Sequence, residues 1–305
     1  MNLLTVSLLL VARVRGAVVD DDCLPADETP SVQLLQVKTS LLQSPGVDPS
    51  FQGALPIEWV HVPKAGSSFV NTLIHVPGIC PGLPEDLVVS EENFGHNQLS
   101  KFNYYYKPAE NCNRSAFDTS RLEHPGIEAV PEGGFEAEKG HFMIFLRQPE
   151  QRMISHFNWL YNLSSADEVP VSSYHIEHTA GCVTKMLTKA DYGCEGEEPN
   201  SIQVAEATRR LRTGFSFIGI TDSWELSICL FNVMFNQDCH SYQFENSRPT
   251  AGKSTPTYNV SVLNGYRDPY DNELYDLALE LFDENLKKFN VSESSCQQCW
   301  DAAGI

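Results

Sequence analysis

Basic residues are scarce in this sequence. The 305-residue chain carries 21 lysines and arginines against 40 aspartates and glutamates, which gives a formal net charge of −19 at pH 7. Proteins that bind nucleic acid or anionic membranes present basic patches, because phosphate groups attract lysine and arginine. The composition therefore argues against nucleic acid and anionic membranes as main partners. It also favours a neutral or weakly charged ligand over a polyanionic one.

Long apolar runs are lacking as well. The apolar stretch at residues 3–12 is too short to span a bilayer, and Arg13 and Arg15 follow it. It matches the apolar region of a signal peptide. Residues 1–17 are therefore expected to be a signal peptide that is cleaved near Ala17, or a short N-terminal anchor. We expect the protein to contact a membrane only through such an anchor.

The composition changes along the rest of the chain. Residues 18–52 are acidic and then polar, with proline and glycine, which is typical of a stem. A domain is expected at residues 53–292. It is followed by a tail at 293–305, in which Cys296 and Cys299 have the spacing of a redox or metal pair but are expected to form a structural disulfide.

Nine cysteines and four Asn-x-Ser sequons agree with a chain that folds in the lumen of the secretory pathway. The sequons lie at Asn113, Asn162, Asn259 and Asn290. The odd number of cysteines leaves one thiol free or intermolecular. Local pairs are plausible for Cys182 with Cys194, Cys229 with Cys239, and Cys296 with Cys299, although the sequence leaves the connectivity open.

A strand, a short turn and a helix are predicted between residues 57 and 74. Aromatic and β-branched residues at 57–62 favour a strand that Pro63 ends, and apolar residues recur at helical spacing from Phe69 onward. The turn between them contains Gly66, and a turn of this kind at the start of a helix presents backbone N–H groups to phosphate. Lys64 adds a charge. Its position before the glycine differs from the ATP-binding GxxxxGK[ST] loop, and an ordinary turn with a solvated lysine is the alternative.

A second apolar strand runs into a helix between residues 141 and 159. Phe142–Leu146 is a continuous apolar run, as expected of a strand buried on both faces of a parallel sheet, and Pro149 suits the first helical position. Arg147 lies at the carboxyl end of this strand, where open α/β sheets bind ligands. Ser155 is expected on the flank of the helix away from its apolar stripe. Surface ion pairing is the alternative for Arg147.

Strand and helix patterns continue to alternate toward the C-terminus. The patterns predict a helix over 201–212, a strand over 215–220, a helix over 224–235 and a long amphipathic helix over 268–289. This alternation predicts an α/β fold, with a parallel β-sheet flanked by helices on both faces in a single domain.

The two strand–turn–helix segments resemble the phosphate-binding motifs of the Golgi-type carbohydrate sulfotransferases, which belong to the P-loop sulfotransferase superfamily. Pro63 to Ser68 is similar to the family's 5′-phosphosulfate loop, and the Arg-x-Pro-x-x-Arg-x-x-Ser pattern from Arg147 to Ser155 is similar to its 3′-phosphate motif. The resemblance implies a P-loop-like sheet and an enzyme of the Golgi lumen, anchored or secreted. It implies transfer of a sulfuryl group from 3′-phosphoadenosine 5′-phosphosulfate (PAPS) to a hydroxyl of a carbohydrate acceptor, with no metal.

The resemblance also assigns roles to residues. Donor binding is implied for Lys64, Ala65, Gly66, Ser67, Ser68, Phe69, Arg147, Arg152 and Ser155. Lys64 is expected to be catalytic as well, because it would neutralise charge on the leaving phosphate. His96 lies in a Gly-His segment similar to one in several members and is the expected general base, with a structural histidine as the alternative. His61 and His141 are expected to be structural.

Two other functions stay open. One is a P-loop kinase, which is disfavoured because residues 251–255 resemble only the end of an ATP loop: Ser247 stands where its first glycine belongs, and Pro256 blocks the helix that should follow. The other is a secreted glycan-binding protein that keeps the fold without turnover. The presence of both phosphate-binding motifs favours the enzyme.

Overall fold

The computed structural model describes residues 54, 57–95, 98–106, 112, 124–129, 133–163, 168–189, 193–194, 196–247 and 257–305. They belong to one compact unit, Gln43–Ile305. The expected signal peptide at 1–17, the expected stem at 18–52 and His96 lie outside the described residues. Among the helices that are described, none combines the length and the apolar character that a membrane span needs.

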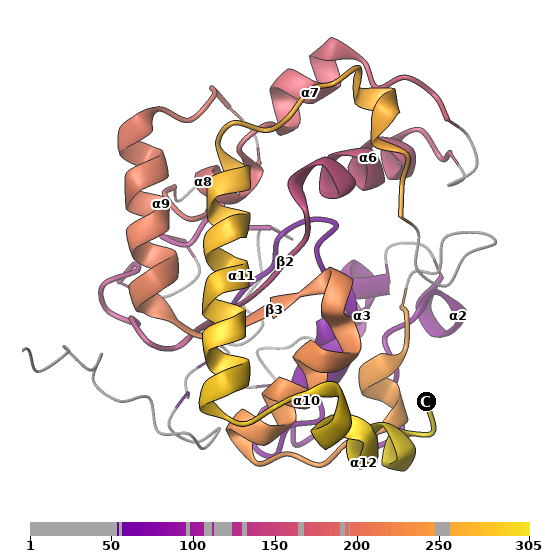
Figure 1. Cartoon of the computed structure of the whole chain (residues 1–305). Helices are drawn as coiled ribbons and strands as arrows, with labels where there is room; N and C mark the ends of the chain where they lie inside the picture. The colour runs from indigo at the N-terminus through magenta and orange to yellow at the C-terminus, as the bar shows by residue number, and fades with distance from the viewer. Residues whose placement is uncertain are drawn as a thin grey trace, which may run out of the picture. The chain divides into compact units, whose positions relative to one another are not determined.

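A parallel sheet of three strands forms the centre of the fold (Figure 1). Its strands are β1 (Glu58–Val60), β2 (Phe142–Leu146) and β3 (Phe215–Ile220), in that spatial order. β2 is the middle strand: Ile144 is in register with Val60 on one side and with Ile218 on the other. All three strands were predicted from their apolar runs, and the α/β class is confirmed.

A helix follows each strand. β1 leads into a 3₁₀ turn, η2 (Ser67–Phe69), and a short helix, α1 (Val70–Leu73). β2 leads into α6 (Pro149–Leu160), which starts at the predicted proline. β3 leads through η3 (Thr221–Ser223) into α10 (Trp224–Phe235), as predicted. The three β–helix turns therefore lie at one edge of the sheet, the edge formed by the carboxyl ends of its strands.

The remaining helices of the described residues lie around this framework. They are α2 (Glu91–Phe94), α3 (Gln98–Tyr106), α7 (Ser173–Thr179), α8 (Cys182–Met186), α9 (Ser201–Gly214), α11 (Asp271–Lys288) and α12 (Glu293–Ala303), with 3₁₀ turns η4 (Ser241–Phe244) and η5 (Val260–Leu263). α9 and α11 pack side by side, and both contact β3 (Figure 1). α9 begins at the predicted residue because Asn200 caps it, accepting from the N–H groups of Ile202 and Gln203.

An aromatic cluster joins the first helix to the sheet. The ring of Phe69 lies 4.8 Å from that of Phe145 on β2, 5.6 Å from Phe217 on β3 and 5.3 Å from Phe231 on α10, measured between ring centroids. Phe69 is fully buried. Burial of a phenylalanine side chain contributes about 1.5–3 kcal/mol to stability, so this cluster fixes the end of the turn after β1 against the two neighbouring strands.

The apolar stripe of α6 is shorter than the sequence predicts. Met153, Ile154 and Phe157 are buried as expected, but Leu160 and Tyr161 are 52 % and 54 % exposed. Ser155, expected on the flank away from this stripe, is itself buried at 6 % exposed. The first two turns of the helix are buried and its last turn is exposed. The spacing of apolar residues shows which side of a helix is apolar, but not how far along the helix that side is covered.

Four disulfides are formed, and they correct two of the three expected pairs. Cys182–Cys194 is confirmed, and Cys80 pairs with Cys112. The pairs Cys229–Cys239 and Cys296–Cys299 are wrong, because the bonds are Cys229–Cys296 and Cys239–Cys299. The ninth cysteine, Cys23, lies outside the described residues.

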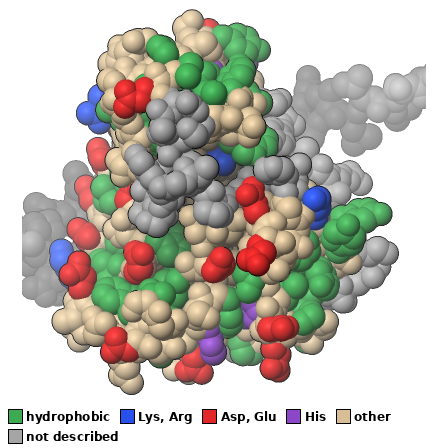
Figure 2. Space-filling model, turned by 90° about the vertical axis from the view of Figure 1, so that its right-hand side faces the viewer, with side chains coloured by type: hydrophobic (Ala, Val, Ile, Leu, Met, Phe, Trp, Pro, Cys, Tyr) green, Lys and Arg blue, Asp and Glu red, His purple; other side chains and the backbone are tan. Residues whose placement is uncertain are grey.

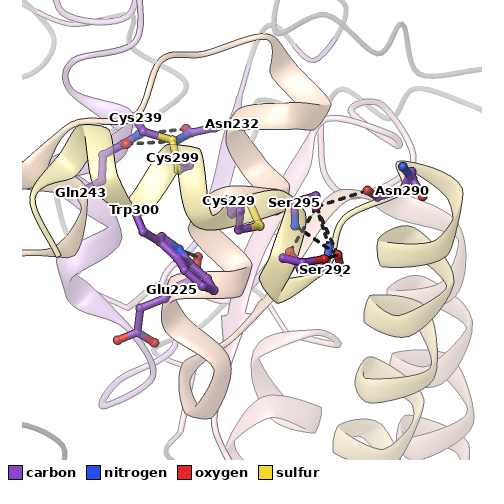
Figure 3. The surroundings of a disulfide bond; sticks show 12 residues. Glu225, Cys229, Asn232, Cys239, Gln243, Asn290, Ser292, Ser295, Cys299 and Trp300 are labelled. Carbon is purple, nitrogen blue, oxygen red and sulfur yellow. Dashed lines mark hydrogen bonds between the residues drawn. A yellow bond between two sulfur atoms is a disulfide. The ribbon is translucent and has the colours of Figure 1, made fainter.

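The physical reason is that the predicted tail is a helix. Cys296 and Cys299 lie three positions apart on α12, so both face the same side of it, toward α10 and η4 (Figure 3). Cys229, on α10, bonds to Cys296, and Cys239, just after α10, bonds to Cys299. Trp300 adds a hydrogen bond from its Nε1 to the carbonyl oxygen of Glu225, 3.4 Å away. α12 is thus fastened at three points, two of them on α10 and one on the segment that follows it.

Candidate functional site

The turn after β1, residues 63–68, is here called the Lys64 loop. Lys64 and Gly66 both have left-handed backbone conformations, with φ of 66° and 82°. A left-handed conformation costs a residue with a Cβ about 1–2 kcal/mol, so Lys64 is held there by its surroundings. Two hydrogen bonds close the loop, from Ala65 N–H to the Val62 carbonyl (3.2 Å) and from Phe69 N–H to the Gly66 carbonyl (3.0 Å). Strained backbone of this kind is concentrated at functional sites.

Gly66 brings the Lys64 loop against the second motif. A Cβ at this position would lie 3.0 Å from Cβ of Phe145 and 3.1 Å from Cζ3 of Trp224. Only glycine fits a left-handed position with that little space. Since Phe145 is on β2 two residues before Arg147, the loop and the start of the second motif are neighbours, as the parallel pairing of β1 with β2 requires.

The two serines of the loop have defined partners. Oγ of Ser67 lies 3.0 Å from Nε2 of His61. Oγ of Ser68 lies 2.9 Å from Oγ of Ser247 and accepts a hydrogen bond from the N–H of that residue at 3.1 Å. Both hydroxyls are therefore oriented by the protein itself. Ala65 and Phe69, in contrast, are buried in the core, so their side chains position the loop and only their backbone faces the edge.

The helix that follows the loop is short. η2 and α1 together cover residues 67–73, so the dipole of a long helix is not available. An anion at this turn would be held by the N–H groups of the first residues, which have no preceding carbonyl in the helix, and by the side chains of Lys64, Ser67 and Ser68.

Arg147 follows β2 directly, at the predicted edge. Its guanidinium carbon lies 5.3 Å from the ring centroid of Tyr258, and Tyr258 is fixed to α6 by two hydrogen bonds between its backbone and the side chain of Gln151, at 2.9 and 2.7 Å. Burial lowers the pKa of Arg147, while the charges of Tyr258 and Asp222 act in the opposite direction. An arginine stays protonated at physiological pH, so a half-buried cation lies beside the Lys64 loop.

Arg152 lies deeper than its assigned role suggests. It is 1 % exposed, and its Nη2 donates to the carbonyl oxygen of Thr179 at the end of α7, 2.7 Å away. Burial lowers the pKa of Arg152, and the charges of Asp271 and Asp268 counter this. In the structure its guanidinium therefore joins α6 to α7 and compensates two buried carboxylates.

The two carboxylates form a network around α8. Asp271 accepts hydrogen bonds from the N–H groups of Val183 and Thr184, both at 2.9 Å, and Asp268 accepts from the N–H of Gly181 at 2.8 Å. Burial, together with Asp268, raises the pKa of Asp271. Lys185 is fully buried beside them, with its Nζ donating to the Gly196 carbonyl at 3.2 Å. Thr184 and Lys185 are thus buried and held by this network.

The last turns of α6 pass close to Lys64. The Nζ of Lys64 lies 5.7 Å from the ring centroid of Trp159, which is 50 % exposed. An ammonium over an indole ring is a cation–π contact. One turn earlier on the helix, His156 feels the charges of Lys64 and Arg152. The half-exposed indole beside a loop lysine is a flat apolar surface at the site.

Four histidines converge here, and the sequence did not indicate this. The histidine cluster consists of His61, His124, His156 and His175. The rings of His61 and His124 are 4.4 Å apart and those of His156 and His175 are 5.2 Å apart. Burial, assisted by Arg152 and neighbouring histidines, lowers the pKa of His156 to about 3, and burial also lowers that of His175. These two rings are neutral at physiological pH.

The cluster is assembled from separate parts of the chain, which explains why it was missed. His61 was expected to be structural, and its contact with Ser67 places it behind the loop. His124 and His156 attract no attention as single residues in the sequence. His141 is the other histidine that was expected to be structural. Its Nδ1 lies 3.0 Å from the carbonyl oxygen of Ala54, at the opposite edge of the sheet, as that expectation requires.

The surface that Figure 2 displays carries far more acidic than basic side chains. This agrees with the net charge of −19 and shows that the acidity is not confined to the N-terminal part of the chain. In the part of the chain that the structure describes, no three His, Cys, Asp or Glu side chains are placed to hold a metal ion. The expectation that the donor needs no metal stays a prediction.

No family model matches the sequence, and no curated protein or solved structure is detectably similar to it.

Proposed function

We propose that this protein is a PAPS-dependent sulfotransferase that transfers a sulfuryl group to a hydroxyl of a carbohydrate acceptor in the secretory lumen. The observation that carries the proposal is the juxtaposition of the Lys64 loop and Arg147 at the carboxyl edge of adjacent parallel strands. Ligands of open α/β sheets bind at this edge. The proposal includes the finer statement of fold, a single P-loop-like domain whose sheet is covered by helices on both faces.

The chemistry of the site supports this proposal. Sulfuryl transfer, like phosphoryl transfer, needs cations and N–H donors around peripheral and bridging oxygens more than it needs covalent participation of the enzyme. Lys64, Ser67 and Ser68 supply these groups on one side. Arg147, half-buried and charged, suits the 3′-phosphate that distinguishes PAPS from ordinary nucleotides, and Ser155 lies two helical turns further along α6.

The acceptor class follows from charge and from Trp159. A polyanionic acceptor would meet an acidic surface, which disfavours it. The half-exposed indole ring beside Lys64 gives a sugar ring an apolar face to pack on. A neutral or weakly charged glycan is therefore the acceptor that this site fits best.

Nucleotide selectivity tests the proposal. The purified domain is titrated with the desulfated product nucleotide (PAP), with ATP and with AMP, and unfolding is followed by heat. At about 100 times its dissociation constant, a ligand raises the free energy of unfolding by about 2.7 kcal/mol. Stabilisation by PAP alone is expected in the wild type, and it is lost in Arg147→Ala and Lys64→Ala.

The matched control is Arg212→Ala, which removes an exposed arginine of α9 whose Nη2 lies 3.8 Å from a carboxylate oxygen of Glu280 on α11. This variant keeps the full response to PAP. A response to ATP instead of PAP would assign the protein to the kinases. The absence of any response would leave the glycan-binding protein without turnover.

A further inference from the structure

His124 occupies a defined position next to the Lys64 loop. Its Nδ1 lies 2.8 Å from the carbonyl oxygen of His61, and its ring packs 4.4 Å from the ring of that residue. His61 in turn contacts Ser67 of the loop through Nε2, at 3.0 Å. One residue, His61, thus connects His124 to the loop through both its backbone and its side chain.

The hydrogen bond to His61 determines which nitrogen of His124 carries the proton. A carbonyl oxygen only accepts, so Nδ1 of His124 is the donor and holds the hydrogen. In the neutral ring Nε2 then has a lone pair and acts as an acceptor. A histidine whose Nδ1–H is fixed by an oxygen, with the lone pair of Nε2 on the other side of the ring, is the arrangement that general bases use.

The other members of the histidine cluster are less suited to this task. His61 uses its Nε2 on Ser67. The pKa of His156, lowered to about 3, makes that ring too weak a base near neutral pH, because an efficient base titrates close to the working pH. His175 is shifted in the same direction and lies behind His156.

His124 and Lys64 share a neighbour. The charges of both act on His156, as the causes of its lowered pKa show. His124 therefore lies in the same electrostatic environment as the lysine that is expected to meet the transferred group. His141, which makes the same kind of bond to a carbonyl, precedes β2 and so lies at the opposite edge of the sheet.

We infer that His124 is the general base that activates the acceptor hydroxyl, an inference that rests on the proposed function. In the transfer step the hydroxyl oxygen forms a bond to the sulfur of PAPS, and the bond from that sulfur to the bridging oxygen of the 5′-phosphate breaks. The electron pair of the broken bond stays on the phosphate, which leaves as PAP. The hydroxyl proton passes to Nε2 of His124, and solvent then removes it.

Release of PAP from PAPS measures this step without knowledge of the natural acceptor. Methyl β-galactopyranoside is supplied as a simple neutral sugar, and transfer to the sugar or to water releases PAP in either case. His124→Gln is expected to lower the rate by at least about 100-fold, the usual contribution of a general base, while its thermal stabilisation by PAP is unchanged. His141→Gln is the matched control and keeps the wild-type rate.

Chemical rescue separates a base from a structural residue. Added imidazole is expected to restore part of the rate to His124→Gly and none to His141→Gly. A second, independent reading comes from nitrogen-15 NMR of the histidine rings, which is expected to show His124 protonated on Nδ1 in the free wild-type protein.

The outcomes are distinguishable. If His124→Gln keeps more than a third of the wild-type rate, or if its ring carries the hydrogen on Nε2, His124 is not the base. If His96→Gln abolishes release while His124→Gln does not, the base is His96. If the wild type releases no PAP above the buffer rate and is not stabilised by PAP, the proposed function fails, and this inference fails with it.

Discussion

The hydroxyl of Ser68 in the Lys64 loop lies 2.9 Å from the hydroxyl of Ser247, 179 positions further along the chain. The carbonyl oxygen of Ser247 accepts in turn from the N–H of Glu91 and from Nε2 of Gln98, both at 3.2 Å. The loop is therefore tied through one buried residue to the first residues of α2 and α3. A phosphate that accepts a hydrogen bond from the Ser68 hydroxyl would therefore compete with the contact between Ser68 and Ser247.

Ser68→Ala is expected to weaken both stability and nucleotide binding. The substitution leaves the N–H of Ser247 without its acceptor, which costs about 1–3 kcal/mol, whereas Ser247→Ala keeps that bond and removes only a hydroxyl, at about 1 kcal/mol. Chemical denaturation measures the stabilities and calorimetry the affinity for PAP. Ser247→Ala should bind PAP as the wild type does; equal binding by Ser68→Ala would remove Ser68 from the phosphate site.

Lys64→Gly is expected to be more stable than Lys64→Ala. Both variants lose the charge, but only glycine adopts a φ of 66° without steric cost. The difference in unfolding free energy should be about 1 kcal/mol. Neither variant should release PAP from PAPS at a measurable rate. Equal stability of the two variants would show that the left-handed conformation at this position carries no strain.

Arg152→Gln is expected to act on stability rather than on donor affinity. Removal of a buried charge that compensates Asp268 and Asp271 costs about 3–5 kcal/mol. Urea denaturation gives this loss, with Arg212→Ala as a surface control that changes stability by less than about 0.5 kcal/mol. For the folded fraction, the dissociation constant for PAP should stay within about threefold of the wild-type value, whereas Arg147→Ala is expected to abolish the stabilisation by PAP.

His156 is expected to make the protein sensitive to mild acid. Its pKa in the folded protein, about 3, lies below the unfolded value of 6.5. Between these two pH values the imidazole is protonated in the unfolded chain and neutral in the folded protein. The stability is complete above pH 6.5 and falls as the pH falls through the window from 6.5 to 3. The limiting slope for one proton is about 1.4 kcal/mol per pH unit.

His156→Gln should therefore lose about 1 kcal/mol less than the wild type between pH 6 and pH 5. Denaturant midpoints at the two pH values give the comparison, with Arg212→Ala, which removes an exposed side chain that does not titrate in this range, as the control that follows the wild-type curve. Parallel curves for wild type and His156→Gln would mean that this ring has the same pKa in the folded and the unfolded protein.

Single cysteine substitutions are expected to release thiols at a distance. Cys299→Ser should leave Cys239 open to alkylation, and Cys296→Ser should leave Cys229 open. Mass spectrometry of the alkylated, digested protein identifies the released residue. Local pairing would instead release Cys296 from Cys299→Ser.

The framework of the fold was predictable from the sequence because each strand is a buried apolar run bounded by a proline, an arginine or a helix cap. β2, β3, α9 and α10 follow their predicted limits within two residues. α11 starts at Asp271 instead of residue 268. The side chain of Asp268 accepts hydrogen bonds from the backbone N–H groups of Tyr270 and Asp271, so Asp268 lies in the turn before the helix.

The site was predictable only in part. Lys64 and Arg147 lie on short motifs, and parallel pairing of their strands brings them together without further information. The positions of His124 and Arg152 depend on contacts between segments far apart in the chain, such as that from Arg152 to Thr179, and no local pattern records such contacts. The pairing of Cys229 with Cys296 was hidden for the same reason, as loop length alone favours the nearer partner.

The fastening of α12 to α10 has a consequence for biosynthesis. Cys229 and Cys239 leave the ribosome 67 and 60 residues ahead of their partners, which at the usual speed of translation is about 3–13 s. During that interval the nearest available partner for each is the other, and a bond between them would be non-native. The native pairs form only after α12 has been synthesised, so an early bond between Cys229 and Cys239 has to be reopened by thiol–disulfide exchange before the native pairs can form.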